Sequence, residues 1–350
     1  MPAEPYDAHL GALLGWLAVG LAGANALSGA LQVDGNQAIA WPTDLTALHA
    51  VDRRAPIDVA VVGSSRAHYA LPPSALDACL SRALGRPTET VAVNRMRASG
   101  WALDLAVRDE LAGSLRPRAL VIEVSPEMLS DHPFDLASNV VAAARTRDLP
   151  DCLAAAGDGD VPTATCARPL TRGVESLAFT LARPWADHAH LTWMAVHHGG
   201  GQYCFDDAAC DARNAAYDTA SAARWDSRAA RVLPQVAAQR FRDWSLEGGM
   251  ASRHLEALLR RARTDGQSVL LVNLPVSADY QAQVPEAAYA ATLDWLDAAA
   301  TRHGATFLDT NTPAWQAARS RFLDPDHLNA EGASVLAREV CAALVDDALH

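Results

Sequence analysis

Two short segments at opposite ends of the chain carry side chains that suit acyl transfer. The first is Gly63-Ser64-Ser65-Arg66, which follows an apolar run typical of a buried strand. Ligands of open α/β sheets bind at the carboxyl ends of the strands, so a serine hydroxyl in this turn would stand where substrates bind. Backbone N–H groups at such a turn, and at the start of the helix after it, can stabilise an oxyanion.

The second segment is a loop in which Asp324 precedes His327 by three residues, just before the final predicted helix. The carboxylate can hold one imidazole nitrogen while the other nitrogen faces a nucleophile, which is the arrangement of acyl-transfer enzymes. Taken separately, each segment has an ordinary explanation, because small residues are common in turns and Asn329 could cap the helix. Their joint occurrence favours a Ser-His-Asp site.

Other polar groups have two interpretations each. Arg66 follows the serines directly and could bind a carboxylate or phosphate of the substrate, or pair within the fold. One group of side chains is the densest in residues that can bind a metal. It could hold a divalent metal, or its histidines could be solvated loop residues. That group is Asp187, His188, His190, His197 and His198. It lacks a metalloenzyme spacing, so the sequence predicts no metal and no cofactor.

Strands and helices are predicted to alternate around the two segments. The predicted strands span residues 57–62, 90–93, 119–124, 269–274 and 306–308. The predicted helices span residues 73–84, 101–115, 286–302 and 333–344, and a charged helix ends near residue 265. Short valine-rich runs are typical of parallel strands that are covered on both faces. We therefore expect an α/β fold, a three-layer parallel sheet flanked by helices on both sides.

Residues 131–245 show no clean alternation, and they hold four tryptophans and four of the six cysteines. We interpret this region as an irregular or helical insertion into one α/β domain over residues 56–350. The tryptophans could stack on sugar rings or lie in a core.

Residues 10–31 contain no ionisable side chain and are long enough to cross a bilayer as a helix. We predict an N-terminal membrane anchor, with residues 1–9 as its flank and residues 32–55 as a linker. A cleaved signal peptide and an apolar helix packed on the main domain are the alternatives. The flank carries Glu4 and Asp7 and no arginine, which is unlike a typical signal peptide.

The cysteines indicate an oxidising compartment. Four of them lie in predicted loops at spacings that suit disulfides. These are Cys152, Cys166, Cys204 and Cys210. Cys79 and Cys341 fall on predicted helices and are either buried thiols or a further bridge.

Membrane topology has conflicting signals. Arg53 and Arg54, the nearest basic residues after the membrane segment, weakly favour a cytoplasmic C-terminus. The cysteines favour the opposite, and we give them more weight. The sequence therefore predicts a single-pass protein of the cell membrane with its main domain outside the cytoplasm; a soluble cytoplasmic enzyme is the alternative.

Composition excludes some partners. Half of the 350 residues are apolar and a fifth are charged, as in a folded globular protein. Acidic residues exceed basic ones by 41 to 29, a formal net charge of −12. Such a field repels phosphate backbones, so no nucleic-acid partner is expected.

On these motifs the chain resembles the SGNH (GDSL-type) hydrolase superfamily over about residues 57–130 and 265–345. Members carry a serine in a Gly-x-Ser turn after the first strand and an Asp-x-x-His pair before the last helix. The resemblance implies a flavodoxin-like arrangement of the sheet. The resemblance implies Ser65 as nucleophile, His327 as general base and Asp324 as the residue that orients it. It also implies that the N–H groups of Ser65 and Gly100 form an oxyanion hole.

The chain departs from the superfamily pattern at two places. Ser64 stands where Gly-Asp-Ser has its aspartate, and residues 124–127 (Val-Ser-Pro-Glu) replace the Gly-x-Asn-Asp block. The side-chain oxyanion donor is therefore missing or comes from elsewhere, such as Asn94 or the insertion.

A Gly-Ser-Ser variant preceded by one membrane segment resembles the envelope branch that includes DltD-like and polysaccharide O-acetylation proteins. The resemblance implies a serine esterase or O-acyltransferase that acts on acyl esters or acylated glycans of the cell envelope, through an acyl-serine intermediate. It also implies a membrane-bound O-acyltransferase as a partner. A non-catalytic glycan-binding or assembly subunit is the alternative function.

Overall fold

The structure is a computed structural model that describes residues 57–95, 98–111, 115–129, 208–241 and 248–347, with Val19, Trp244 and Leu246 besides. The predicted membrane segment, apart from Val19, lies outside the described residues, as do the linker, the histidine cluster and most of the insertion. Among the described helices, none combines the length and apolar character needed to span a bilayer.

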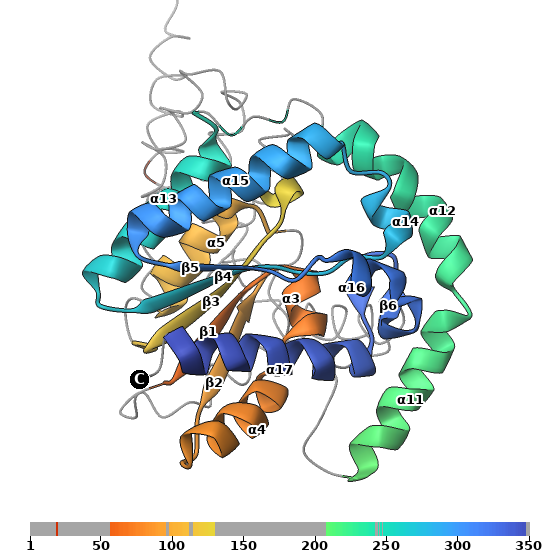
Figure 1. The fold of residues 1–350 in the computed structure, drawn as a ribbon, viewed down its shortest axis with the longest axis horizontal. Coiled ribbons are helices and arrows are strands. Elements are labelled where there is room, and N and C mark those ends of the chain that lie inside the picture. The colour runs from red at the N-terminus through yellow and green to blue at the C-terminus, as the bar shows by residue number, and fades with distance from the viewer. Residues whose placement is uncertain are drawn as a thin grey trace, which may run out of the picture.

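A five-stranded parallel sheet forms the centre of the fold (Figure 1). Its strands are β1 (Val59–Gly63), β2 (Thr90–Asn94), β3 (Ala119–Val124), β4 (Ser268–Asn273) and β5 (Thr306–Asp309). They lie in the order β2-β1-β3-β4-β5. This is the order of flavodoxin-like doubly wound sheets, which have a binding crevice where the strand order reverses, between β1 and β3.

Helices cover both faces of the sheet (Figure 1). One layer holds α5 (Gly100–Ala106), α13 (Met250–Thr264) and α15 (Glu286–His303). The other holds α3 (Ser65–Ala70), α4 (Pro73–Leu84) and α17 (Ala330–Asp347). Side chains alternate between the two faces along a strand. Ala60 and Val62 of β1 therefore pack in the core on the α5, α13 and α15 side, and Val59 and Val61 pack in the core on the α3, α4 and α17 side. The predicted α/β class, with helices on both faces of a parallel sheet, is confirmed.

Smaller elements gather at the carboxyl end of the sheet. β6 (Phe322–Asp324) and β7 (His327–Leu328) form an antiparallel hairpin. Around it lie α14 (Ala278–Gln281), α16 (Pro313–Ala317) and two 3₁₀ turns, η3 (Pro126–Leu129) and η6 (Arg319–Arg321). Two helices of the predicted insertion, α11 (Ala208–Ala222) and α12 (Trp225–Gln235), also contact β6, and α12 continues into a π-helical turn, η5 (Val236–Arg240).

Several predicted elements match the observed bounds closely. The structure has α4 over Pro73–Leu84 and β3 over Ala119–Val124, as expected. The helix expected over residues 101–115 ends earlier as an α-helix, at Ala106, and becomes a π-helical segment, η2 (Val107–Leu111). The short helix α3, which begins at Ser65, is not among the predicted elements.

Cys79 and Cys341 form a disulfide. The bond joins α4 to α17, which pack side by side on the same face of the sheet. Of the two interpretations left open by the sequence, the bridge is correct. It connects the first long helix of the domain to the last one.

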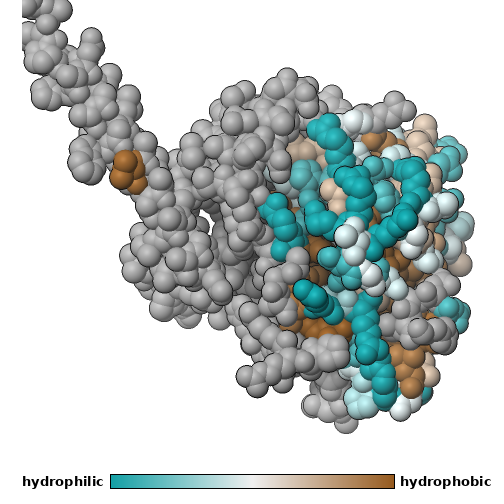
Figure 2. All heavy atoms as spheres, turned by 90° about the vertical axis from the view of Figure 1, so that its left-hand side faces the viewer, coloured by the Kyte–Doolittle hydropathy of each residue, from teal (hydrophilic) through white to brown (hydrophobic). Residues whose placement is uncertain are grey.

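The opposite end of the sheet, where the strands begin, faces the viewer in Figure 2, and hydrophilic side chains cover much of the described surface there. Exposed arginines lie in the segments that lead into these strands, namely Arg116, Arg118, Arg263 and Arg302. The candidate site lies at the other end, among the smaller elements.

Candidate active site

The turn after β1 presents Ser65 as the first residue of α3. Ser64 caps this helix, because its Oγ accepts a hydrogen bond from the Arg66 N–H at 3.1 Å. Gly63 has no room for a side chain: a Cβ there would lie 2.6 Å from Glu123 Oε2. The glycine therefore lets β1 and β3 approach α3 closely. The Ser64 side chain then fixes the turn between β1 and α3.

A fully buried carboxylate on β3 organises the same turn. Glu123 accepts hydrogen bonds from the Ser64 N–H at 2.6 Å, the Ala67 N–H at 3.2 Å and the Ser64 hydroxyl at 2.8 Å. Burial raises the pKa of Glu123, while Arg66 and these hydrogen bonds oppose that rise. Among the hydrogen bonds of the described residues, the Ser65 N–H has no acceptor, so this donor is left free at the start of the helix. A helix N-terminus with a free N–H suits an oxyanion.

The β6–β7 hairpin brings a histidine to this serine. The His327 Nε2 lies 2.9 Å from Ser65 Oγ, and its Nδ1 lies 2.9 Å from Asp324 Oδ1. Asp324 Oδ1 also accepts hydrogen bonds from the backbone N–H groups of Asp326 and His327, at 3.1 and 3.0 Å. In the neutral tautomer with its proton on Nδ1, the imidazole accepts a hydrogen bond from the serine hydroxyl. The three residues predicted from the two motifs therefore form one hydrogen-bonded chain.

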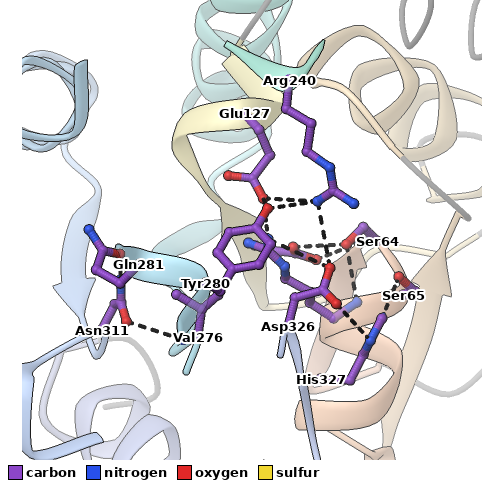
Figure 3. Close-up of polar contacts among 12 residues, drawn as sticks. Ser64, Ser65, Glu127, Arg240, Val276, Tyr280, Gln281, Asn311, Asp326 and His327 are labelled. Atoms are coloured by element: carbon purple, nitrogen blue, oxygen red, sulfur yellow. Dashed lines mark hydrogen bonds and ion pairs between the residues drawn. The ribbon is translucent and has the colours of Figure 1, made fainter. Parts of the chain in front are cut away.

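A second carboxylate faces the same imidazole. Asp326 Oδ1 lies 3.4 Å from His327 Nδ1, and Figure 3 shows Asp326 between this histidine and Arg240. Burial disfavours a charged imidazole, but Asp324 and Asp326 outweigh it and raise the pKa of His327 to about 9. Burial likewise opposes ionisation of Asp326, yet His327 and two arginines hold its pKa well below the usual value. Asp326 lies next to His327 in the same loop but outside the Asp-x-x-His pair, so the motif gave no sign of its contact with the imidazole.

A compact network of charges surrounds Asp326 (Figure 3). Arg66 forms a buried ion pair with Glu127 and lies 4.0 Å from Asp326 Oδ2. The Tyr280 hydroxyl donates to Glu127 Oε1 at 2.8 Å and accepts a hydrogen bond from Arg240 Nη1 at 2.7 Å. Burial opposes ionisation of Glu127, but the two arginines lower its pKa. In this network two arginines pair with two carboxylates, and most of the side chains are buried.

Arg66, predicted as a substrate-binding residue, has only 6% of its side chain exposed. Its guanidinium packs over the Tyr280 ring and pairs with internal carboxylates. Pairing within the fold is thus observed, and contact with a substrate stays a prediction.

The two remaining predicted oxyanion donors lie near the carboxyl ends of the central strands. Asn94 ends β2 in register with Gly63, and its buried amide has no hydrogen-bond partner for either atom among the described residues. Gly100 begins α5, where a Cβ would overlap the carbonyl oxygen of Ala251 on α13. Close packing of the two helices accounts for this glycine. The oxyanion roles of Asn94 and Gly100 stay predictions.

Within the described part of the chain, one group of side chains has the composition and spacing to hold a metal ion. Potential ligand atoms of Asp324, Asp326 and His327 all lie within 4.8 Å of one another. Arg228 and Arg240 already face the two carboxylates, and their charges oppose the binding of a cation. We therefore assign no metal to this cluster.

Comparison with known proteins gives no family for this chain: no family model matches it, and no curated protein matches it closely enough to count as a relative.

Proposed function

We propose that the protein is a serine-dependent esterase or acyltransferase that uses Ser65, His327 and Asp324. The observation that carries the proposal is the hydrogen-bonded chain from the Ser65 hydroxyl through the His327 imidazole to Asp324. Nucleophile, base and orienting carboxylate in hydrogen-bond contact are the defining geometry of this chemistry on unrelated folds.

In the proposed reaction, Ser65 Oγ attacks the carbonyl carbon of an acyl ester, and its proton moves to His327 Nε2. The free Ser65 N–H, at the start of α3, is placed to donate to the oxyanion of the tetrahedral intermediate. The bond to the leaving alcohol then breaks, and the imidazolium returns the proton to that alcohol. An acyl-serine remains.

In the second half, an acceptor hydroxyl gives its proton to His327 and attacks the acyl-serine, and the serine leaves with that proton. Water as acceptor makes the protein an esterase, whereas a sugar hydroxyl makes it an acyltransferase. The choice depends on whether the site excludes water and positions the sugar.

The finer part of the proposal rests on the resemblance to the SGNH superfamily. It assigns the protein to the envelope branch, with its catalytic domain outside the cytoplasm, an acylated glycan or polymer as substrate and a membrane-bound O-acyltransferase as partner. Two features are compatible with it. The Cys79–Cys341 disulfide suits an oxidising compartment, and the sheet has the expected flavodoxin-like strand order.

The proposal is tested by labelling the full-length chain with a fluorophosphonate probe and mapping the modified peptide by mass spectrometry. Such a probe needs only an activated serine and an oxyanion hole, so the natural substrate need not be known. We expect an adduct on Ser65 that is lost in Ser65→Ala and in His327→Gln.

Ser320→Ala and His303→Gln are the matched controls, because they lie outside the site, and they should label like the unmodified chain. If the folded, unmodified protein forms no adduct at Ser65, the esterase proposal is wrong. The glycan-binding or assembly subunit would then be the better explanation.

A further inference from the structure

A helix of the predicted insertion reaches the carboxylate of the candidate triad. Arg228, on α12, places Nη2 at 2.8 Å from Asp324 Oδ2. The other carboxylate oxygen of Asp324 already accepts three hydrogen bonds, from the imidazole and from two backbone N–H groups. Among the described residues, Arg228 faces the remaining oxygen as an ion pair, since that oxygen accepts no hydrogen bond there. The Arg228 side chain is 21% exposed, against 1% for Asp324.

The same segment supplies a second arginine to the second carboxylate. Arg240, at the end of η5, lies 3.5 Å from Asp326 Oδ2, and its Nη1 also donates to the Tyr280 hydroxyl. Figure 3 shows the Arg240 side chain approaching Asp326 on the side away from His327. Asp324 and Asp326 are therefore each held between the imidazole and an arginine.

We propose that Arg228 and Arg240 are positioning residues, and that the α12–η5 segment (residues 225–240) is a clamp that fixes the two carboxylates facing His327. The proposal rests on the proposed function of the site and extends it to the insertion. It assigns this segment a direct part in setting the strength of the base.

Electrostatics gives the clamp a measurable consequence. Among the described residues, Asp324 and Asp326 face the imidazole from its own loop. Arg228 and Arg240 from the clamp, and Arg66 from α3, face these two carboxylates. The Tyr69 ring, also from α3, packs edge-on against the histidine.

Each arginine offsets part of the negative charge that the imidazole experiences. Loss of either arginine leaves a carboxylate without its cation, so the protonated imidazole becomes more stable and less neutral base is present at pH 7.

A purely structural role predicts a different result. If the arginines contribute only to the stability of the fold, water replaces them beside the carboxylates. Their loss then lowers the free energy of unfolding but leaves the titration of His327 unchanged in the folded protein. The midpoint of that titration therefore separates a clamp from a stabilising ion pair.

The experiment compares Arg228→Met with the unmodified full-length chain, using two measurements from about pH 6 to about pH 11, so that both midpoints lie inside the range. The first is the rate of fluorophosphonate labelling. The second is the NMR titration of the His327 imidazole in protein labelled with ¹³C-histidine, assigned by the loss of its signal in His327→Gln. We expect the midpoint to rise by about one pH unit and labelling at pH 7 to fall about tenfold.

Two further variants complete the comparison. Arg228→Lys keeps the charge and should restore the midpoint, whereas Arg231→Met removes an exposed arginine of the same helix and should change nothing. Arg240→Met should raise the midpoint as Arg228→Met does, and it replaces that variant if Arg228→Met does not fold.

A midpoint equal to that of the unmodified chain in either folded methionine variant overturns the clamp. The NMR measurement needs no catalysis. If the unmodified chain does not label but the midpoint still moves in Arg228→Met, the esterase proposal fails while the clamp stands.

Discussion

Asp326→Asn gives the sharpest test of how the site sets the strength of its base. The pKa of His327 is about 9, compared with an ordinary value of 6.5, because Asp324 and Asp326 outweigh the effect of burial. With that pKa, only about 1% of the imidazole is neutral at pH 7. The candidate base therefore rests mostly in its protonated form, which cannot accept the serine proton.

The substitution removes one of the two negative charges while Arg240 and Arg66 stay in place. The protonated imidazole loses one attractive carboxylate, and the two arginines are left without that carboxylate to balance their charge. Both effects destabilise the protonated imidazole, so the pKa of His327 should fall by about one unit or more. A drop of one unit raises the neutral fraction at pH 7 to about 10%, so labelling of Ser65 should speed up roughly tenfold at that pH. At pH 10 the gain disappears, because the base is then neutral in both proteins.

The assay is the rate of fluorophosphonate labelling between pH 5.5 and 10, with Asp297→Asn, an exposed residue of α15, as the matched control. A pH midpoint in Asp326→Asn at or above that of the unmodified chain would refute the electrostatic reasoning. A tenfold loss of rate at every pH, with the midpoint unmoved, would instead show that Asp326 acts by holding the loop in shape.

Three further predictions concern stability. Glu123→Gln leaves buried N–H and hydroxyl donors without a carboxylate, so the free energy of unfolding measured in urea should fall by about 3 kcal/mol, whereas Glu286→Gln on the surface should stay within ~0.5 kcal/mol of the unmodified chain. Gly100→Ala forces α5 away from the Ala251 carbonyl and should cost about 1–3 kcal/mol in the same assay; an unchanged midpoint would contradict the close packing. Because the folded pKa of His327 is raised to about 9, its stabilising contribution is complete below pH 6.5 and is lost as pH rises through 9. Thermal unfolding should accordingly show a loss of about 3 kcal/mol across that interval, and a loss that persists undiminished in His327→Gln would rule out this histidine as its source.

The sheet was predictable because its strands are short apolar runs buried on both faces. The runs near Val59–Gly63 and Ala119–Val124 lack the polar residues that recur on one face of an amphipathic helix. Their composition therefore identifies them as buried strands. Helix α3 was missed because its six residues are too few to show a period. Glu123 could have been recognised as a site residue, because a carboxylate inside an apolar strand needs a buried hydrogen-bond partner.

The candidate site was predictable only in part. The spacing of Asp324 and His327 defines a local loop, and the turn after a first strand has a fixed place in the fold, so these residues could be named before the structure was known. The structure joins them by hydrogen bonds, and their chemical roles stay predictions.

Arg228 and Arg240 could not have been found from the sequence. Nothing within α12 or η5 distinguishes them from exposed helical arginines such as Arg231. Their partners, Asp324 and Asp326, lie far along the chain and meet them only through tertiary packing.

The disulfide between Cys79 and Cys341 gives the molecule an unusual covalent connectivity. The two cysteines are 262 residues apart, with the candidate nucleophile just before the first and the candidate base just before the second. A protease that cuts the backbone once between residues 79 and 327 would therefore separate serine and histidine into two peptides that remain one covalent molecule. Such a nicked protein would migrate as a single band without reductant and as two bands with it, and the site could survive the cut with its halves on different chains.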